Sequence, residues 1–177
     1  MKSCFFSGHR EASSELLPAL AEAVEKHITE YGVTEFIVGN YGGFDHMAAK
    51  AVIAAKARHP GITLSMLIPY HPAERPSELP QGFDNTFYPP GMEKVPRKLA
   101  IVRANRYMVD HVDYLIAYAW HPASNARDLV EYAGKRAQRN LISVTVLPRF
   151  IHGRNKRIRC SAVLHPLILR PSIRRCS

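Results

Sequence analysis

No apolar run in the sequence is long enough to cross a membrane. A membrane-spanning helix needs about 20 consecutive apolar residues, and none of the apolar stretches in this 177-residue chain approaches that length. The N-terminus also lacks a signal-peptide pattern, because Lys2 leads directly into a short strand. There are only three cysteines, and they lack metal-site spacing. We therefore expect a cytoplasmic protein without a metal, with Cys4 as a core thiol.

The common phosphate-binding and nucleophile motifs are missing as well. Neither the G-x-G-x-x-G fingerprint of dinucleotide-binding folds nor the Lys-Ser/Thr pair of a P-loop occurs. No serine, cysteine or threonine stands in a recognisable nucleophile motif, and His46, His71 and His121 do not have metal-ligand spacing. The sequence therefore indicates a ligand pocket more clearly than it indicates a reaction.

Acidic residues are absent from the C-terminal stretch. Residues 149–177 hold eight of the 24 Lys and Arg residues and no Asp or Glu, so the other 148 residues carry 16 basic and 15 acidic side chains, a balance of +1. We expect residues 1–148 to form one domain and 149–177 to be a basic tail that is disordered or loosely attached. The near-neutral domain does not favour nucleic acid as a partner, except through the tail.

Short apolar strands alternate with amphipathic helices along the domain. The pattern predicts strands at 2–6, 36–38, 62–68, 114–118 and 142–147, with a helix in each of the four intervals between them. This order predicts a Rossmann-like three-layer α/β sandwich, with a mainly parallel sheet of five or more strands. If the first three strands grow outward in one direction, the strand at 114–118 returns to the other side of the first. The crevice between these two is a topological switch point, where ligands bind.

Residues 69–92 form a long segment with six prolines and two glycines, which excludes a long helix. Residues Asn85 to Tyr88 are compatible with a short strand. A loop of this length in a compact domain is either a lid or binding loop or a rigid connector across the sheet edge.

A glycine-rich turn follows the second strand. Gly39, Gly42 and Gly43 leave almost no side chains before a helix that is under way by Phe44. Such a turn either exposes main-chain N–H groups to a phosphate at a helix start, or only permits close packing of helix and sheet. Asp45 fits a partner of the helix dipole better than a catalyst.

Three loops are expected to converge at the switch point, namely 7–10, 39–45 and 120–125. Arg10 is the best single phosphate candidate, the alternative being a surface ion pair with Glu11 or a neighbour. Asn105 lies on an apolar helix stripe and requires a hydrogen-bond partner. Tyr41, Phe44, Tyr70 and Trp120 either stack on a base or pack beneath their loops. The candidate ligand-binding residues are Ser7, Gly8, His9, Arg10, Gly39, Gly42, Gly43, Phe44, Asp45, Asn105, Arg106, Ser124 and Asn125.

Several of these segments also resemble one known family. Phe5-Phe6-Ser7-Gly8-His9-Arg10, the Gly42–Asp45 turn with Ala48-Ala49, and above all the segment 103–118 are similar to the YpsA-like proteins of the SLOG (Smf/DprA–Lonely Guy) superfamily. The resemblance covers about residues 2–147. It implies a bacterial Rossmann-like protein with a pocket for nucleotides or nucleotide-derived ligands.

The Lonely Guy enzymes of that superfamily are nucleoside monophosphate phosphoribohydrolases. Their Pro-Gly-Gly-x-Gly-Thr-x-x-Glu signature is replaced here by Pro122-Ala-Ser-Asn-Ala-Arg-Asp, and Glu131 falls one position late. Asp45 and Glu131 remain the candidate catalytic carboxylates.

The sequence thus predicts binding of a nucleotide or an ADP-ribose-like ligand, which is compatible with a sensor, with N-glycosidic hydrolysis and a DprA-like nucleic-acid-binding module as the alternatives. Homo-oligomerisation is left open.

Overall fold

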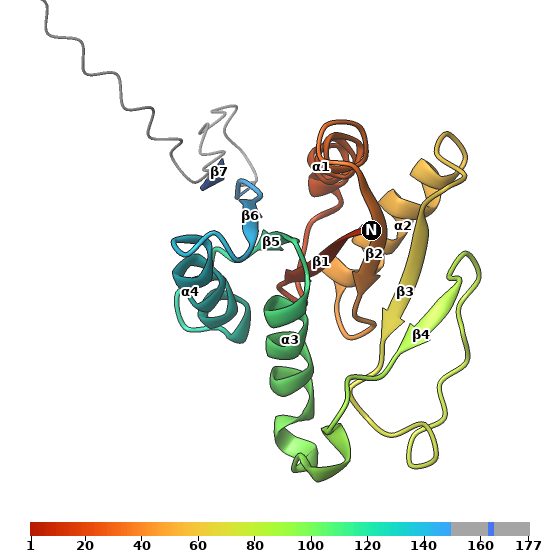
Figure 1. Ribbon diagram of the computed structural model, residues 1–177, viewed down its shortest axis with the longest axis vertical. Helices are drawn as coiled ribbons and strands as arrows, with labels where there is room; N and C mark the ends of the chain where they lie inside the picture. The colour runs from red at the N-terminus through yellow and green to blue at the C-terminus, as the bar shows by residue number, and fades with distance from the viewer. Residues whose placement is uncertain (150–162, 165–177) are drawn as a thin grey trace, which may run out of the picture.

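The chain folds as a parallel β-sheet between two layers of helices in the computed structural model (Figure 1), which describes residues 1–149 and 163–164. The strands are β1 (Lys2–Gly8), β2 (Val33–Val38), β3 (Thr63–Leu67), β4 (Asn85–Phe87), β5 (Tyr114–Tyr118), β6 (Ser143–Val146) and β7 (Val163–Leu164). The helices are α1 (Leu17–Thr29), α2 (Gly43–Lys56), α3 (Ala100–His111) and α4 (Asn125–Ala137). This confirms the predicted Rossmann-like α/β architecture.

The strand order is β4-β3-β2-β1-β5-β6-β7. All pairs are parallel except the last, in which β7 runs antiparallel to β6. The chain therefore reverses its direction of growth between β1 and β5, as the sequence predicted. The carboxyl ends of these two strands, Gly8 and Tyr118, are register partners. The loops that follow them begin side by side, with the His9 amide donating to the Tyr118 carbonyl at 3.2 Å.

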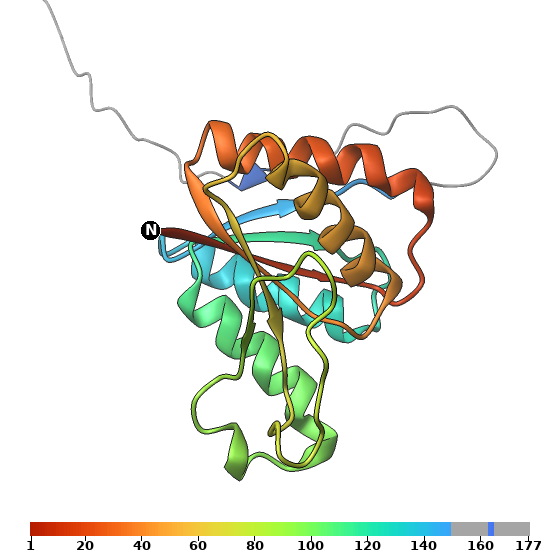
Figure 2. The ribbon, with the colours of Figure 1, turned by 90° about the vertical axis from the view of Figure 1, so that its right-hand side faces the viewer.

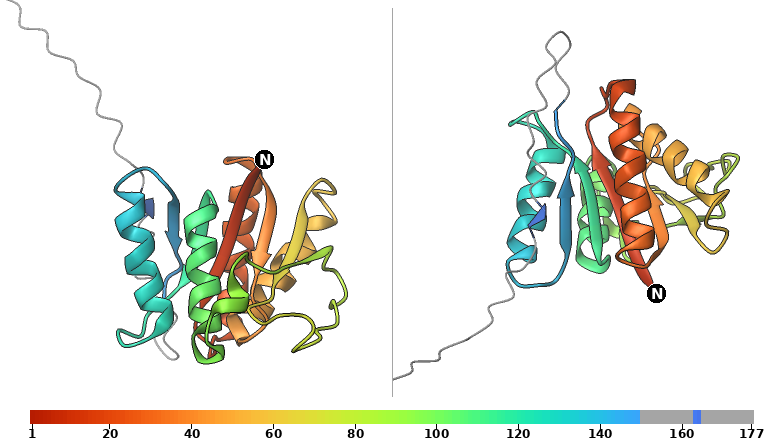
Figure 3. Two further views of the ribbon diagram at one scale, coloured as in Figure 1. Left: turned by 60° about the horizontal axis from the view of Figure 1, so that its bottom comes forward. Right: turned by 90° about the horizontal axis from the view of Figure 1, so that it is seen from above.

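Adjacent residues of β1 face opposite helix layers, because side chains alternate across a strand. Phe6 is buried in the core formed with α1 and α2, whereas Phe5 is buried with α3 and α4. Figure 2 shows the first helix pair over one face of the sheet and the second pair over the other, and Figure 3 gives the same layers from two further directions. Cys4 is a fully buried free thiol, as predicted.

Two boundaries differ from the sequence pattern, which predicts a helix from about Pro96 to His111 and a capping pair of Asn125 and Asp128 for the next helix. Residues 96–99 do not begin the α-helix; Arg97–Leu99 form a 3-10 turn, and α3 starts at Ala100. The cap of α4 is Ser124, whose hydroxyl accepts the Arg127 amide at 3.2 Å. Asn125 therefore stands inside the helix, at its first position.

The predicted tail lies almost entirely outside the described residues. Within the described part of the chain, no helix is long and apolar enough to span a membrane.

Candidate functional site

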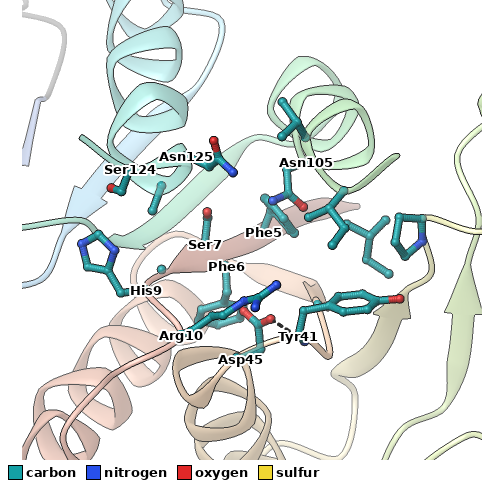
Figure 4. A pocket seen from close by; sticks show the side chains of 18 of the residues that line it. Phe5, Phe6, Ser7, His9, Arg10, Tyr41, Asp45, Asn105, Ser124 and Asn125 are labelled. Atoms are coloured by element: carbon teal, nitrogen blue, oxygen red, sulfur yellow. Dashed lines mark hydrogen bonds between the residues drawn. The ribbon is translucent and has the colours of Figure 1, made fainter. Parts of the chain in front are cut away.

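A cavity of about 400 Å³ opens at the β1/β5 switch point. The loops after β1, β2 and β3 contribute to its wall, together with α3 and the start of α4. Of the sequence-predicted site residues it brings together Ser7, Gly8, His9, Arg10, Gly39, Gly42, Asp45, Asn105, Ser124 and Asn125. Figure 4 shows the side chains of Ser7, Arg10, Asn105 and Asn125 directed toward this common space.

Four of the polar side chains in the cavity have no hydrogen-bond or ion-pair partner within the described residues. They are the hydroxyl of Ser7, the guanidinium of Arg10 and the amides of Asn105 and Asn125. The Ser7 residue is only 6% exposed, and its hydroxyl lies at the cavity surface, where a ligand can reach it. The alternative role of Arg10, an ion pair with Glu11 or a neighbour, is not found among the ion pairs of the described chain. The side-chain amide of Asn105, for which the sequence required a hydrogen-bond partner, is therefore open to a ligand in the cavity.

The start of α4 adds two main-chain donors. Ser124, Asn125 and Ala126 line the cavity. Because Asn125 and Ala126 are the first two residues of the helix, their N–H groups have no intrahelical acceptor, and within the described chain no other acceptor lies at hydrogen-bond distance. The Ser124 hydroxyl is already engaged, since it accepts from Arg127 and donates to the His121 carbonyl at 2.9 Å. Two free N–H groups at a helix N-terminus favour an anion.

The glycine-rich turn before α2 has a different role from the phosphate cradle considered in the sequence. The Gly43 amide donates to the Arg10 carbonyl at 2.8 Å, and the Tyr41 amide donates to the Asp45 carboxylate at 3.0 Å. A Cβ on Gly43 would lie 2.7 Å from the Arg10 carbonyl oxygen, and one on Gly42 would lie 2.9 Å from the Arg10 Cα. These glycines therefore let the Arg10 loop pack directly on α2, and the amides of Tyr41 and Gly43 already donate within the protein.

Asp45 acts as the partner of its own helix start, the role that the sequence favoured. Burial raises the pKa of its carboxyl, and the hydrogen bond from the Tyr41 amide opposes that rise. The glycine at position 39 lets the Asp45 carboxylate lie close to the main chain, because a Cβ on Gly39 would lie 2.8 Å from that carboxylate.

His9 holds the loop after β5 in place. Its Nε2 accepts the amides of Trp120 and His121 at 2.9 and 3.0 Å. An Nε2 that accepts two hydrogen bonds cannot carry a proton, so the ring is neutral, with its proton on Nδ1. Desolvation, followed by the charge of His121, lowers the pKa of His9, which agrees with this state.

Three of the sequence-predicted residues, together with Glu131, lie outside the cavity wall. Gly43 packs against the Arg10 loop, and Phe44 is fully buried, stacked on Tyr118. Arg106 lies with its guanidinium 4.3 Å from the centre of the Tyr132 ring. Glu131 forms an exposed i,i+4 ion pair with Arg127 at 3.1 Å.

Sequence reasoning missed most of the α3 side of the wall. Lys98, Ile101 and Val102 line the cavity there. Lys98 precedes the amphipathic helix and lies in the 3-10 turn Arg97–Leu99, so the helical period did not predict its place in the cavity wall. The helical period that placed Asn105 inward could have found Ile101, which is four residues earlier on the same face.

No protein-family model matches the sequence, and no curated protein matches it. Solved structures that share the fold include two DNA processing proteins. One is DNA processing protein A (DprA) from Streptococcus pneumoniae, with 18% identity, a TM-score of 0.60, and coverage of 85% of this chain and 52% of that one. The other is DprA from Helicobacter pylori, described for its single-stranded DNA binding mode, with 15% identity, a TM-score of 0.54, and coverage of 85% and 67%. The chain thus spans about half the length of the pneumococcal protein.

Proposed function

We propose that the protein binds single-stranded nucleic acid, one nucleotide of which enters the cavity at the β1/β5 switch point. The observation that carries the proposal is the set of unsatisfied donors and acceptors around a single cavity: Ser7, Arg10, Asn105, Asn125 and the two free amides of α4. A ligand must complement both a cation and neutral amides. A nucleotide does so with its phosphate and the polar edge of its base.

The phosphate is assigned to the start of α4 and Arg10. The free amides of Asn125 and Ala126 offer two hydrogen bonds along the helix axis, and the Arg10 guanidinium adds a planar pair of donors. Lys98 supplies a second cation at the cavity wall. We thus assign the anion to Arg10 and the start of α4, and give the glycine-rich turn the packing role, the second of the two roles that the sequence left open for it.

The base is assigned to the α3 side. Ile101 and Val102 offer apolar surface there, and the Asn105 amide can donate and accept at a base edge. An asparagine amide pairs well with any base edge that presents a donor beside an acceptor.

The near-neutral net charge of the domain is only weak evidence against nucleic-acid binding. The balance of +1 is a sum over the domain, whereas binding depends on charge at the site. Arg10 and Lys98 line the cavity, and the carboxyl that lines it, Asp45, is engaged with the α2 turn and has a raised pKa. Supporting the proposal, the Helicobacter DprA that shares this fold binds single-stranded DNA. We further propose that the chain is a SLOG protein related to the YpsA-like group.

A free nucleotide derivative, such as an ADP-ribose-like molecule, is the second candidate. The volume of about 400 Å³ favours it, because it lies within the range of small-molecule sites. The hydrolase alternative has less support. Glu131 is paired on the surface and Asp45 is engaged with the α2 turn, so neither carboxylate is free beside a sugar.

Isothermal titration calorimetry tests the proposal with two probes, thymidine monophosphate and an oligothymidylate of about a dozen nucleotides. Arg10→Ala should weaken both by about tenfold or more, since a charge-assisted hydrogen bond contributes about 1.5–3 kcal/mol. Arg139→Ala is the matched control, because Arg139 is exposed beyond the far end of α4. Equal affinity of Arg10→Ala and wild type for both probes would remove Arg10 from the site, and no binding by wild type would refute the proposal. Tighter binding of the monophosphate than of the oligomer would favour the second candidate.

A further inference from the structure

Two tyrosines and two arginines form a cluster beside the cavity, where the loop after β3 meets the 3-10 turn before α3. We call Tyr41, Tyr70, Arg75 and Arg97 the tyrosine–arginine platform. The Arg75 guanidinium lies 5.3 Å from the centre of the Tyr70 ring and 5.9 Å from that of Tyr41. Arg97 lies 5.9 Å from the Tyr70 ring, and the two tyrosine rings meet edge to face at 6.2 Å.

The two arginines keep their charges available. Both are exposed, and neither has a carboxylate within ion-pair distance in the described part of the chain. A guanidinium that lies against an aromatic ring still directs its N–H groups outward, in its own plane. The rings therefore hold the two cations in place without neutralising them, an arrangement that suits phosphate oxygens.

The platform is continuous with the cavity. Tyr41 belongs to both, and Arg97 directly precedes Lys98, which lines the cavity. Pro69 lines this cavity and a second one of about 220 Å³, which Tyr70 and Arg97 also line. A chain of phosphates that leaves the first cavity past Tyr41 thus meets Arg75 and Arg97 next.

Acidic groups also line the second cavity. Glu74 and Glu93 line it together with Tyr88, and their charges, after desolvation, contribute to a raised pKa of Tyr88. The negative charge thus lies near Tyr88, whereas the two unpaired guanidiniums lie on Tyr70. This division directs a polyanion along the Tyr41 side of the platform.

Resting on the proposed function, we propose that the tyrosine–arginine platform is a second nucleotide subsite. It binds the nucleotide next to the one in the cavity, with the phosphate held by Arg75 and Arg97 and the base stacked on the Tyr41–Arg75 surface. Aromatic rings and guanidinium planes both serve as stacking surfaces for single-stranded nucleic acid. The ligand is therefore a strand of at least two nucleotides, and a mononucleotide reaches only the cavity.

Fluorescence anisotropy with a labelled oligothymidylate, and competition by thymidine monophosphate, test this assignment on the full chain. The double variant Arg75→Gln/Arg97→Gln keeps a hydrocarbon stem and a planar end group over Tyr70 and removes both charges. Lys135→Gln/Arg139→Gln is the matched control, since it removes two exposed charges at the far end of α4. Melting temperatures of both variants show whether the platform loop stays folded.

The platform variant should bind the oligomer about tenfold or more weakly, and the monophosphate within about twofold of wild type. The slope of log Kd against log salt should fall by about 0.7, the value for one lost phosphate contact on a single strand. The control should leave all three quantities unchanged. If the double variant binds the oligomer as wild type does, the platform is not a subsite and the proposed function stands. If wild type binds neither probe, both are wrong.

Discussion

Replacing Gly43 by alanine distinguishes between the two roles of the glycine-rich turn, which are close packing against the Arg10 loop and direct contact with a phosphate. The added Cβ would lie 2.7 Å from the Arg10 carbonyl oxygen, which also accepts the Gly43 amide. The Arg10 carbonyl belongs to the main chain and the added Cβ is fixed to the Cα of residue 43, so neither atom can rotate away. Overpacking of this kind costs about 1–3 kcal/mol, and a weakened hydrogen bond adds about 1 kcal/mol. We therefore expect Gly43→Ala to lower the free energy of unfolding by about 2–4 kcal/mol.

For a chain of this size, each kcal/mol changes the melting temperature by about 2–4 °C, so the variant should melt roughly 4–16 °C lower in a differential scanning calorimetry experiment. Gly134→Ala is the control. Apart from its chain neighbours and the backbone of α4 itself, no atom of the described residues lies within 4 Å of a Cβ at that position, and alanine should stabilise the helix by about 0.5–1 kcal/mol. An unchanged melting temperature in Gly43→Ala, together with lost nucleotide binding, would refute the packing role and restore the turn as the anion site.

The remaining predictions concern buried charge, catalysis and the tail. Burial lowers the pKa of His27 from 6.5, so the unfolded chain takes up the proton first as the pH falls. The free energy of unfolding should then decrease below about pH 6.5, by at most about 1.4 kcal/mol per pH unit from this group. His27→Asn, which keeps a donor for the Ala23 carbonyl, should have a smaller decrease in urea titrations at pH 7.5 and 5. Glu131→Ala should change stability by less than about 0.5 kcal/mol and leave nucleotide affinity unchanged in calorimetry. The purified protein should release no base from AMP in a chromatographic assay; release that Asp45→Ala or Glu131→Ala abolishes would establish the hydrolase alternative. Deleting the predicted tail, residues 149–177, which includes the two-residue edge strand β7, should leave the melting temperature nearly unchanged; a large drop would make that segment part of the core.

The fold could be predicted because its signals are local. Apolar runs such as 36–38 and 114–118 mark buried strands, and the helices between them impose parallel pairing and right-handed crossovers. The switch point followed from strand order alone. β7 was missed, since a two-residue strand carries no periodic signal.

The site was predicted in its location but only partly in its roles. The strand ends identified Ser7 and Arg10, and the apolar stripe of α3 identified Asn105. The role of the glycines could not be read from the chain, because it depends on how closely the Arg10 loop approaches α2. The free donors at α4 depend on the Ser124 cap, which lies one residue before the predicted one. The pattern did not separate Arg106 from Asn105, although positions one residue apart on a helix differ by about 100° in direction.

Nuclear magnetic resonance of the ¹⁵N-labelled protein, titrated with thymidine monophosphate, tests the nucleotide pocket most directly. We expect the largest chemical-shift changes at the backbone amides of Asn125 and Ala126 and at the side-chain amide groups of Asn105 and Asn125. The amides of Tyr41 and Gly43, which already donate within the protein, should shift less. If the largest changes occur at Tyr41 and Gly43, or if none occur at millimolar nucleotide, the proposed nucleotide pocket at α4 and Asn105 is wrong.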